Sequence, residues 1–294
     1  MAIARSESVG DHGGGWDPDW AALESPMIQL FTRHTPRTVH QFWHRCYFED
    51  LWELMGAGAR AARYLEMGAG RGTTSMYLAS NGCDVTMLDL SRKGFDVARS
   101  NFFRERLHLP TFVHADARRT NLPPDSFDCV LSIGLLEHFE DPRPVLSESV
   151  RLLRPGGLCF AVIIPQKHAR VRYLAHGLFC PWVLVYQLMP DGLKAKVRRV
   201  RGRSPSADRI GVVRTAYSRS EYIRMLDGLN VVDISCAPYN PYHAVYSSAW
   251  LETHLSVPLF RLHRAIKRVY AHPPLTSTSA ALGSCDLLTF RKRR

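Results

Sequence analysis

The chain has 294 residues, 46% of them hydrophobic, which is enough to bury a full core in one large domain with insertions. Its seven cysteines are odd in number and include no C-x-x-C pair, which argues against a disulfide framework and a zinc site and indicates a reducing compartment. The formal net charge of +11 is uneven, because residues 1–160 sum to −3 and residues 161–294 to +14. No basic segment followed by an apolar run opens the sequence, and the mostly apolar stretch 177–189 is shorter than the ~20 residues that span a bilayer, so we expect a cytoplasmic protein.

The first predicted element is a helix over residues 35–55, rich in large apolar side chains. Thr35 is typical of an N-cap, and Pro36 suits the first helical turn. We expect this helix to act as a lid. His40 and His44 are spaced i, i+4, but no acidic residue or cysteine has matching spacing, so we expect packing or surface histidines and no metal site.

A glycine turn follows a short apolar strand at residues 64–67. Glycine occupies positions 68, 70 and 72, and a second apolar strand, residues 85–88, ends at Asp89. A strand, a glycine turn, a helix and a strand ending in an acid describe half of a nucleotide-binding α/β sheet. Dinucleotide folds need G-x-G-x-x-G, whereas here the third glycine comes one position early and Thr73 stands in its place. A nucleotide without a pyrophosphate is therefore expected.

Three further strands are predicted after the first two. Residues 112–115 run out into an acid, and residues 126–133 form a strand whose entrance is marked by Asp128, which we interpret as structural. Residues 154–157 read Arg-Pro-Gly-Gly, which predicts a helix end and a turn before a fifth strand at residues 158–164.

The C-terminal part supplies the last elements. Ser218 and Glu221 predict a capping box at the start of a helix, and residues 230–236 and 286–290 predict strands. Between these elements lie two long insertions, residues 166–217 and residues 240–280. Connections of this length need helices of their own, and both leave the sheet at the carboxyl ends of its strands, so we expect them to cap an acceptor pocket.

Residues 258–270 illustrate the expected cap. They predict a basic amphipathic helix that begins at Pro258. We favour packing of its apolar face on the domain with a solvated basic face, and contact with an anionic membrane surface is the alternative. The apolar face would carry Leu259, Leu262, Ile266 and Val269.

In this order the motifs resemble those of the class I S-adenosylmethionine-dependent methyltransferases, in particular the quinone-biosynthesis-like group that acts on small molecules. The resemblance covers residues 60–165 and returns at the C-terminus. It implies an α/β fold with a doubly wound, mostly parallel seven-stranded Rossmann-like sheet, an antiparallel last strand and helical cap insertions. The implied organisation is a tail and lid helices (1–60), a cofactor-binding core (61–165), a first cap (166–217), a continuation of the core (218–239), a second cap (240–280) and a last strand with a basic tail (281–294).

The resemblance also implies the cofactor, S-adenosylmethionine, and the residues that hold it. The glycine turn would lie under the methionine part, Asp89 would hold the ribose hydroxyls and Asp116 would accept from the adenine amino group. Glu66 would organise the methionine amino group, directly or through water. The expected cofactor-binding residues are Glu66, Gly68, Ala69, Gly70, Gly72, Asp89, Leu90, Asp116, Ala117 and Ile133.

Methyl transfer from a sulfonium leaves the protein mainly to position the acceptor, and an oxygen or activated-carbon acceptor also has to lose a proton. His138 follows the fourth strand and is our candidate for the base. Such a histidine after a glutamate is also compatible with a packing or hydrogen-bonding role. His168 and Tyr173, just after the fifth strand, are weaker candidates.

Two parts of the sequence bear on the class of acceptor: the segment after the fourth strand and the basic C-terminal part. Residues 133–136 read Ile-Gly-Leu-Leu in place of a Pro-Pro-aromatic sequence, which disfavours a nucleic-acid acceptor. We expect a small-molecule acceptor with an anionic group that would use the C-terminal arginines, such as a natural product or glycan intermediate, and we favour oxygen as the methylated atom. The alternatives are a peripheral membrane enzyme of a lipid-linked intermediate at the inner membrane surface, and a non-catalytic cofactor-binding partner or sensor.

Overall fold

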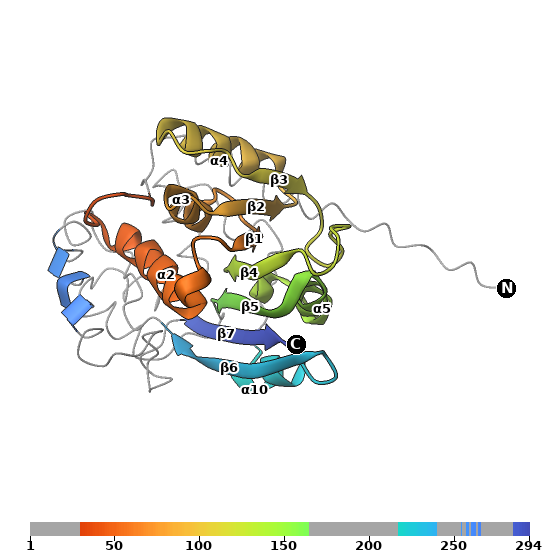
Figure 1. Ribbon diagram of the computed structural model, residues 1–294. Coiled ribbons are helices and arrows are strands. Elements are labelled where there is room, and N and C mark those ends of the chain that lie inside the picture. Colours follow the sequence, from red (N-terminus) through yellow and green to blue (C-terminus); the bar gives the residue numbers. More distant parts are fainter. Residues whose placement is uncertain are drawn as a thin grey trace, which may run out of the picture.

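The computed structural model describes residues 30–164, 217–239 and 285–294, together with residues 254, 257–258, 260–262 and 264–265. Its centre is a seven-stranded sheet in the order β3-β2-β1-β4-β5-β7-β6 (Figure 1). Only β7 runs antiparallel to its neighbours β5 and β6, which confirms the predicted sheet. The strands are β1 (Arg63–Met67), β2 (Asp84–Asp89), β3 (Thr111–His114), β4 (Phe127–Ile133), β5 (Leu153–Ile163), β6 (Val231–Tyr239) and β7 (Cys285–Lys292).

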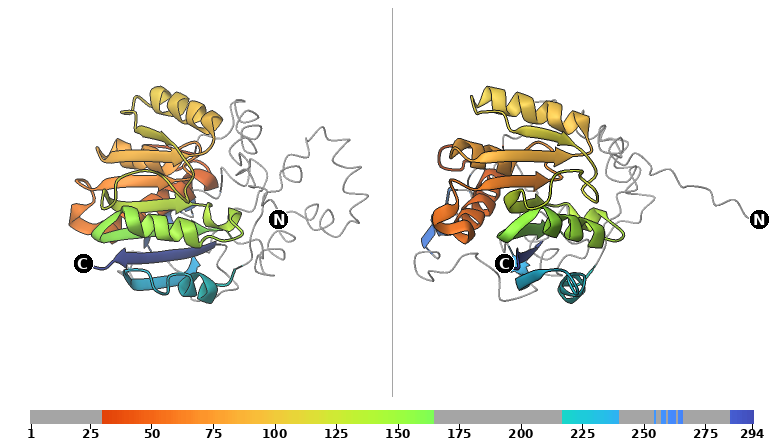
Figure 2. Two further views of the ribbon diagram at one scale, coloured as in Figure 1. Left: turned by 90° about the vertical axis from the view of Figure 1, so that its right-hand side faces the viewer. Right: turned by 45° about the vertical axis from the view of Figure 1, so that its right-hand side comes forward.

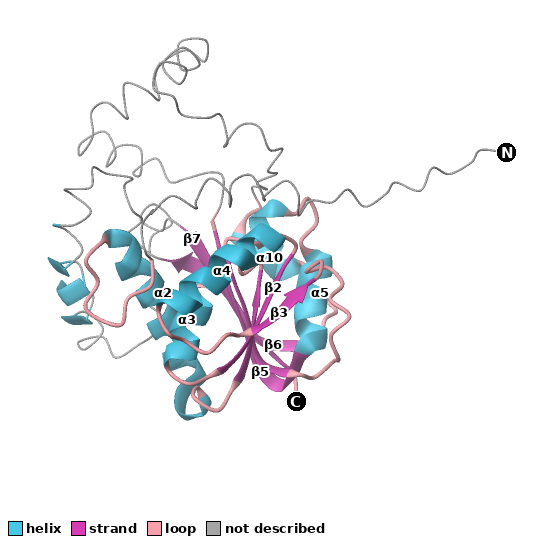
Figure 3. Cartoon of the chain, turned by 90° about the horizontal axis from the view of Figure 1, so that it is seen from above, coloured by secondary structure: helices cyan, strands magenta, loops and turns pink. Residues whose placement is uncertain are grey.

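Helices cover both faces of this sheet, as the view from above shows (Figure 3). One hydrophobic core packs the first three helices of the described chain against one face, and a second core packs two later helices against the other. The first layer holds α2 (Val39–Met55), α3 (Thr73–Ser80) and α4 (Arg92–Arg104), and the second holds α5 (Arg143–Leu152) and α10 (Arg219–Arg224). Short 3-10 turns, η1 (Gly56–Gly58) and η2 (Leu136–His138), precede β1 and follow β4.

The central strands are apolar on both faces because both faces are covered. In β1, Tyr64 packs into the core under α2 and α3, and its neighbour Leu65 packs into the core under α5. Both side chains are fully buried. The Tyr64 hydroxyl donates to the carbonyl of Ala59 at 2.7 Å, so this buried polar atom is satisfied.

The start of the first described helix differs from the prediction. Helix α2 begins at Val39, and its N-cap is Thr38, whose hydroxyl accepts from the Gln41 amide. The Gln41 side chain in turn accepts from the Arg37 amide at 2.9 Å. These two bonds satisfy the amides of Gln41 and Arg37 at the helix start, and they outweigh the Thr35 and Pro36 signal.

Strand β5 also differs from the prediction, because it begins at Leu153 rather than after a turn at residues 154–157. Leu153 already pairs with Phe127 of β4, and a register shift then absorbs the extra residues before Leu158 pairs with Cys129. Gly156, with φ of +81°, belongs to this irregular stretch. A bulge of this kind lets a strand carry a glycine pair that would otherwise mark a turn.

The C-terminal elements follow the prediction more closely. Ser218 and Glu221 form the predicted capping box at the start of α10. The last strand, dark blue in Figure 2, lies in the sheet beside β5 and β6. Since Tyr239 at the end of β6 pairs with Cys285 at the start of β7, the segment between them leaves and returns at the carboxyl edge of the sheet.

The predicted caps, residues 166–217 and 240–280, lie outside the described residues apart from Tyr217 and a few helical positions between 254 and 265. Within these, Phe260 rather than Leu262 is buried, and Leu262 is 51% exposed. Phe260 packs edge-on against Phe42 of α2 with ring centroids 5.8 Å apart, so an aromatic contact selects the packed face. Membrane contact and the domain boundaries stay predictions. No helix in the described part of the chain is long and apolar enough to cross a bilayer.

Candidate functional site

The glycine turn lies where the chain leaves β1 at the carboxyl edge. Gly68, Gly70 and Gly72 have φ values of +66°, +49° and +70°, which favour glycine. A Cβ on Gly68 would lie 2.6 Å from Leu135 Cδ1, so the turn packs directly against Leu135 of the segment after β4, and a side chain at Gly68 would displace it. The Ala69 amide donates to the carbonyl of Leu88 at 3.1 Å and fixes the turn against β2.

Asp89, at the end of β2, lies directly beside this turn. Its Oδ2 accepts from the Gly70 amide at 2.7 Å and its Oδ1 accepts from the Ser91 amide at 2.8 Å. Two backbone donors therefore orient one half-buried carboxylate between the ends of β1 and β2. Leu90 follows it, and its carbonyl lies 2.8 Å from His114 Nε2 on β3.

Glu66 lies inside the domain behind the glycine turn, with only 4% of its surface exposed. Its Oε2 accepts from both the amide and the hydroxyl of Ser75 on α3, the amide bond measuring 2.9 Å. Burial raises the pKa of Glu66 to about 7, although the bonds from Ser75 lower it. Sequence analysis missed Ser75, because nothing in the sequence shows that the α3 N-terminus turns back over β1.

Asp116, after β3, is bound by an arginine. Arg118 donates to its carboxylate through the backbone amide at 2.8 Å and through the side chain, with Nη2 2.6 Å from Oδ2. These bonds raise the pKa of Arg118. Ala117 between them is buried. Sequence analysis missed Arg118, although an acid followed two residues later by arginine is a usable signal for a local Asx turn and ion pair.

The segment after β4 carries the candidate base. The strand ends at the half-buried Ile133, and Gly134, with φ of +71°, turns the chain into η2. The buried Glu137 and the partly buried His138 follow, with His138 Nε2 4.0 Å from Glu137 Oε1. Because Leu135 contacts the glycine turn, the structure brings the loop of His138 to the same edge as the turn.

Other candidates fall outside this arrangement. His168 and Tyr173 lie outside the described residues. Across residues 30–164 and the other described ranges, no group of three or more histidine, cysteine or acidic side chains is placed to hold a metal ion. His44 of α2 instead contacts the Tyr47 ring edge-on.

Comparison with known proteins shows which family the chain belongs to. Residues 65–161, from β1 to β5, match the family described as a methyltransferase domain. A ubiquinone biosynthesis O-methyltransferase of Aromatoleum aromaticum is 30% identical over 67% of this chain and 76% of its own length. One of the same name from Pseudomonas aeruginosa (strain UCBPP-PA14) is 31% identical over 72% of this chain and 87% of its own.

The chain belongs to the class I S-adenosylmethionine-dependent methyltransferases. Its cofactor is S-adenosylmethionine and its activity is methyl transfer. The crystal structure of a possible histamine N-methyltransferase from Thermotoga maritima shares the fold of this methyltransferase. The TM-score is 0.54 at 13% identity, over 96% of this chain and 99% of the other.

Proposed function

We propose that this methyltransferase transfers the methyl group to a hydroxyl oxygen of a small acceptor related to the ring precursors of quinones. Two relatives that cover most of their own length on this chain are named ubiquinone biosynthesis O-methyltransferases. The single structural observation that carries the proposal is the contact of Leu135 with the glycine turn, because it sets His138 at the edge where the cofactor belongs. An anionic group on the acceptor would meet the basic residues of the predicted caps at 166–217 and 240–280, because Arg291 and Arg294 lie at the opposite edge of the sheet.

The described residues fit the cofactor. Gly68, Gly70 and Gly72 have positive φ values that favour glycine, so the turn keeps a backbone without side chains at these three positions, as a turn under a ligand requires. Gly68, Ala69, Gly70 and Gly72 would lie under the methionine part.

The acids of this edge would hold the rest of the cofactor. Asp89, oriented by two amides, would hold the ribose hydroxyls beside Leu90. Asp116 and Ala117 would meet the adenine, and Arg118 would have to release part of its contact with the Asp116 carboxylate. Ile133 would lie beside the bound nucleoside.

Glu66 would act from behind the turn. Its carboxylate is buried and bound to Ser75, so it would act on the methionine ammonium through charge rather than through an exposed contact.

His138 is the proposed base of the reaction. Bound S-adenosylmethionine supplies a methyl group already activated by the sulfonium. The chain then has to hold the acceptor oxygen in line and accept its proton. The imidazole of His138 would take this proton, and the Glu137 carboxylate 4.0 Å away would stabilise the positive charge that the ring gains.

The test is a transfer assay with labelled S-adenosylmethionine and a panel of hydroxylated benzoates and benzoquinols, with product analysis by mass spectrometry and NMR. We expect O-methyl products. His138→Gln should lower kcat by about 10²- to 10⁴-fold and remove the acidic limb of the pH–rate profile, with S-adenosylhomocysteine affinity unchanged.

The matched control is His108→Gln, because His108 is exposed in the loop after α4. It should leave the profile unchanged. An unchanged kcat in His138→Gln would assign His138 a packing role, and products methylated on carbon or nitrogen would contradict the oxygen acceptor.

A further inference from the structure

A pocket lies at the amino edge of the sheet, opposite the glycine turn. It is formed by the amino ends of β1, β4 and β5, the carboxyl end of β7 and the turn after α2, and its volume is about 410 Å³. Pockets of this size hold small molecules. Gly58, Ala61, Ala62 and Gly157 line it with little side-chain volume, which leaves the space open.

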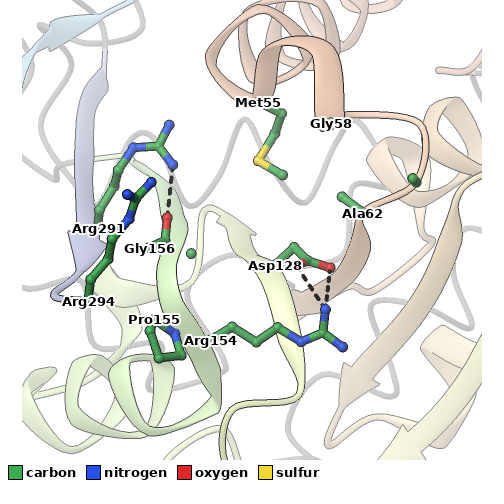
Figure 4. A pocket seen from close by; sticks show the side chains of 11 residues that line it. Met55, Gly58, Ala62, Asp128, Arg154, Pro155, Gly156, Arg291 and Arg294 are labelled. Carbon is green, nitrogen blue, oxygen red and sulfur yellow. Dashed lines mark hydrogen bonds and ion pairs between the residues drawn. The ribbon is translucent and has the colours of Figure 1, made fainter.

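Three arginines and one aspartate supply the charge of this pocket, as Figure 4 shows. Arg154 reaches across it to Asp128, with Nη1 3.1 Å from Oδ1. Asp128 Oδ2 also accepts from the Arg63 amide at the start of β1, at 2.8 Å. The negative charge of Asp128 is therefore already met by its own partners.

Arg291 and Arg294 supply the remaining positive charge. Arg291 donates to the carbonyls of Gly156 and Leu54, both at 3.1 Å, and these neutral acceptors orient its guanidinium without cancelling its charge. Arg294 lies beside it, with its Nε 3.5 Å from the place where a Cβ on Gly156 would stand. Within the described ranges, neither arginine forms an ion pair with an acidic side chain.

We propose that this pocket binds the phosphate group of a small anionic ligand. The pocket has three guanidinium groups against one carboxylate side chain, so its side chains favour an oxyanion with several acceptor oxygens, such as phosphate. Planar guanidinium groups bind oxyanions through paired N–H donors, and Arg291 has five such donors, two of which are used in the bonds to carbonyls.

The pocket is separate from the cofactor edge. Strand β1 has five residues, so the two edges lie about 16 Å apart along it. A phosphate ligand should therefore bind without competing with the cofactor.

The experiment is isothermal titration calorimetry of the full chain saturated with S-adenosylhomocysteine, at constant ionic strength, with inorganic phosphate and with glycerol 3-phosphate. We expect both to bind. Arg294→Gln and the double variant Arg154→Gln/Arg294→Gln should weaken binding by about tenfold or more. Gly58→Glu should also weaken it, because a Cβ at Gly58 meets no atom within 4 Å and the added carboxylate would repel the ligand.

The matched controls are Arg293→Gln, which removes the same charge from the adjacent residue outside the pocket, and Gly58→Gln. Both should bind phosphate as the parent chain does. Equal weakening by Arg293→Gln, or unchanged binding in the double variant, would overturn the proposal.

A second experiment measures binding of the chain to vesicles of phosphatidylcholine with phosphatidic acid. Binding to them that depends on Arg294 would identify a lipid headgroup as the source, and its absence alongside glycerol 3-phosphate binding would identify a soluble ligand.

Discussion

Glu66 and Asp89 lie in the neighbouring strands β1 and β2, Asp116 lies just after β3, and each has a different kind of partner. Glu66 is buried against a serine, Asp89 is held by backbone amides and Asp116 is paired with an arginine. Partners of these kinds act differently on a carboxylate, because burial disfavours its charge whereas donors and cations favour it. For Glu66, burial outweighs the bonds from Ser75 and raises the pKa to about 7.

This pKa predicts a pH dependence of stability. The folded pKa of Glu66 is about 7, above its usual 4.5, so the folded state holds the extra proton between these values. Stability from this group should be greatest below the lower value and fall as the pH rises through about 7, by up to about 3 kcal/mol. Glu66→Gln should remove that fall.

Urea unfolding of the parent chain and of Glu66→Gln, each at about pH 5 and about pH 8, tests this prediction. The quantity compared is the free energy of unfolding that each protein loses between the two pH values. The control is Glu140→Gln, because Glu140 is exposed. If Glu66→Gln loses as much stability over this range as the parent chain, the buried carboxylate is not the titrating group.

Among the elements, α5 is tied to the loop after β3 by one side chain. Glu148 accepts from the amide and the hydroxyl of Thr120, at 2.8 and 2.6 Å, and from the guanidinium of Arg151 on its own helix. Burial raises the pKa of Glu148, but the bonds from Arg151 and Thr120 outweigh it and lower the pKa to about 2. One carboxylate thus joins the loop that carries Asp116 to the second helix layer.

Glu148→Gln should destabilise the fold by about 2 kcal/mol near neutral pH, because it weakens charge-assisted bonds and leaves Arg151 without its ion pair. The sign is opposite to that of Glu66. The folded pKa is depressed, so the contribution is present above 4.5 and is lost as the pH falls toward 2.

Thermal unfolding at neutral pH and at about pH 3 tests this prediction, with Glu140→Gln as the exposed control. A destabilisation of the same size at both pH values would show that packing, and not the carboxylate charge, is what Glu148 contributes.

At the scale of the whole molecule, the parallel strands separate two edges with different chemistry. The carboxyl edge presents the glycine turn with Asp89, and the amino edge presents the arginine pocket. A ligand at either edge should stabilise the entire sheet, since binding to the folded state shifts the unfolding equilibrium.

This coupling gives a prediction for Asp89. Saturating S-adenosylhomocysteine at about 100 times its Kd should stabilise the parent chain by about 2.7 kcal/mol. Asp89→Asn should weaken binding by about tenfold to a hundredfold and so shrink the ligand-induced rise in Tm, whatever it does to the unliganded protein.

Asp84→Asn is the matched control, because Asp84 is the exposed acid at the other end of the same strand. It should retain the full rise in Tm. A full rise in Asp89→Asn as well would remove Asp89 from the cofactor site.

From local patterns, sequence analysis predicted where the strands lie along the chain, the glycine turn and the acid at the end of β2, because these depend on contacts within short segments; the seven-stranded sheet was implied by the family resemblance. Alternation or continuity of apolar residues, positive φ at glycine and the capping box at Ser218 are local properties. The starts of α2 and β5 were predicted wrongly, because in each case a neighbouring residue has the better partner. Thr38 has a better partner in Gln41 than Thr35 has, and β4 extends β5 back through a glycine pair.

By itself, then, the sequence determined the sheet and the family of the methyltransferase. Only the tertiary structure decided which partner each carboxylate meets and where the arginines converge. Ser75 reaches Glu66 only because α3 folds back over β1, and Arg291 reaches the carbonyl of Leu54 across 237 residues of chain. Such contacts depend on packing between elements, which no local pattern encodes, and they decide the protonation of Glu66 and the charge of the arginine pocket.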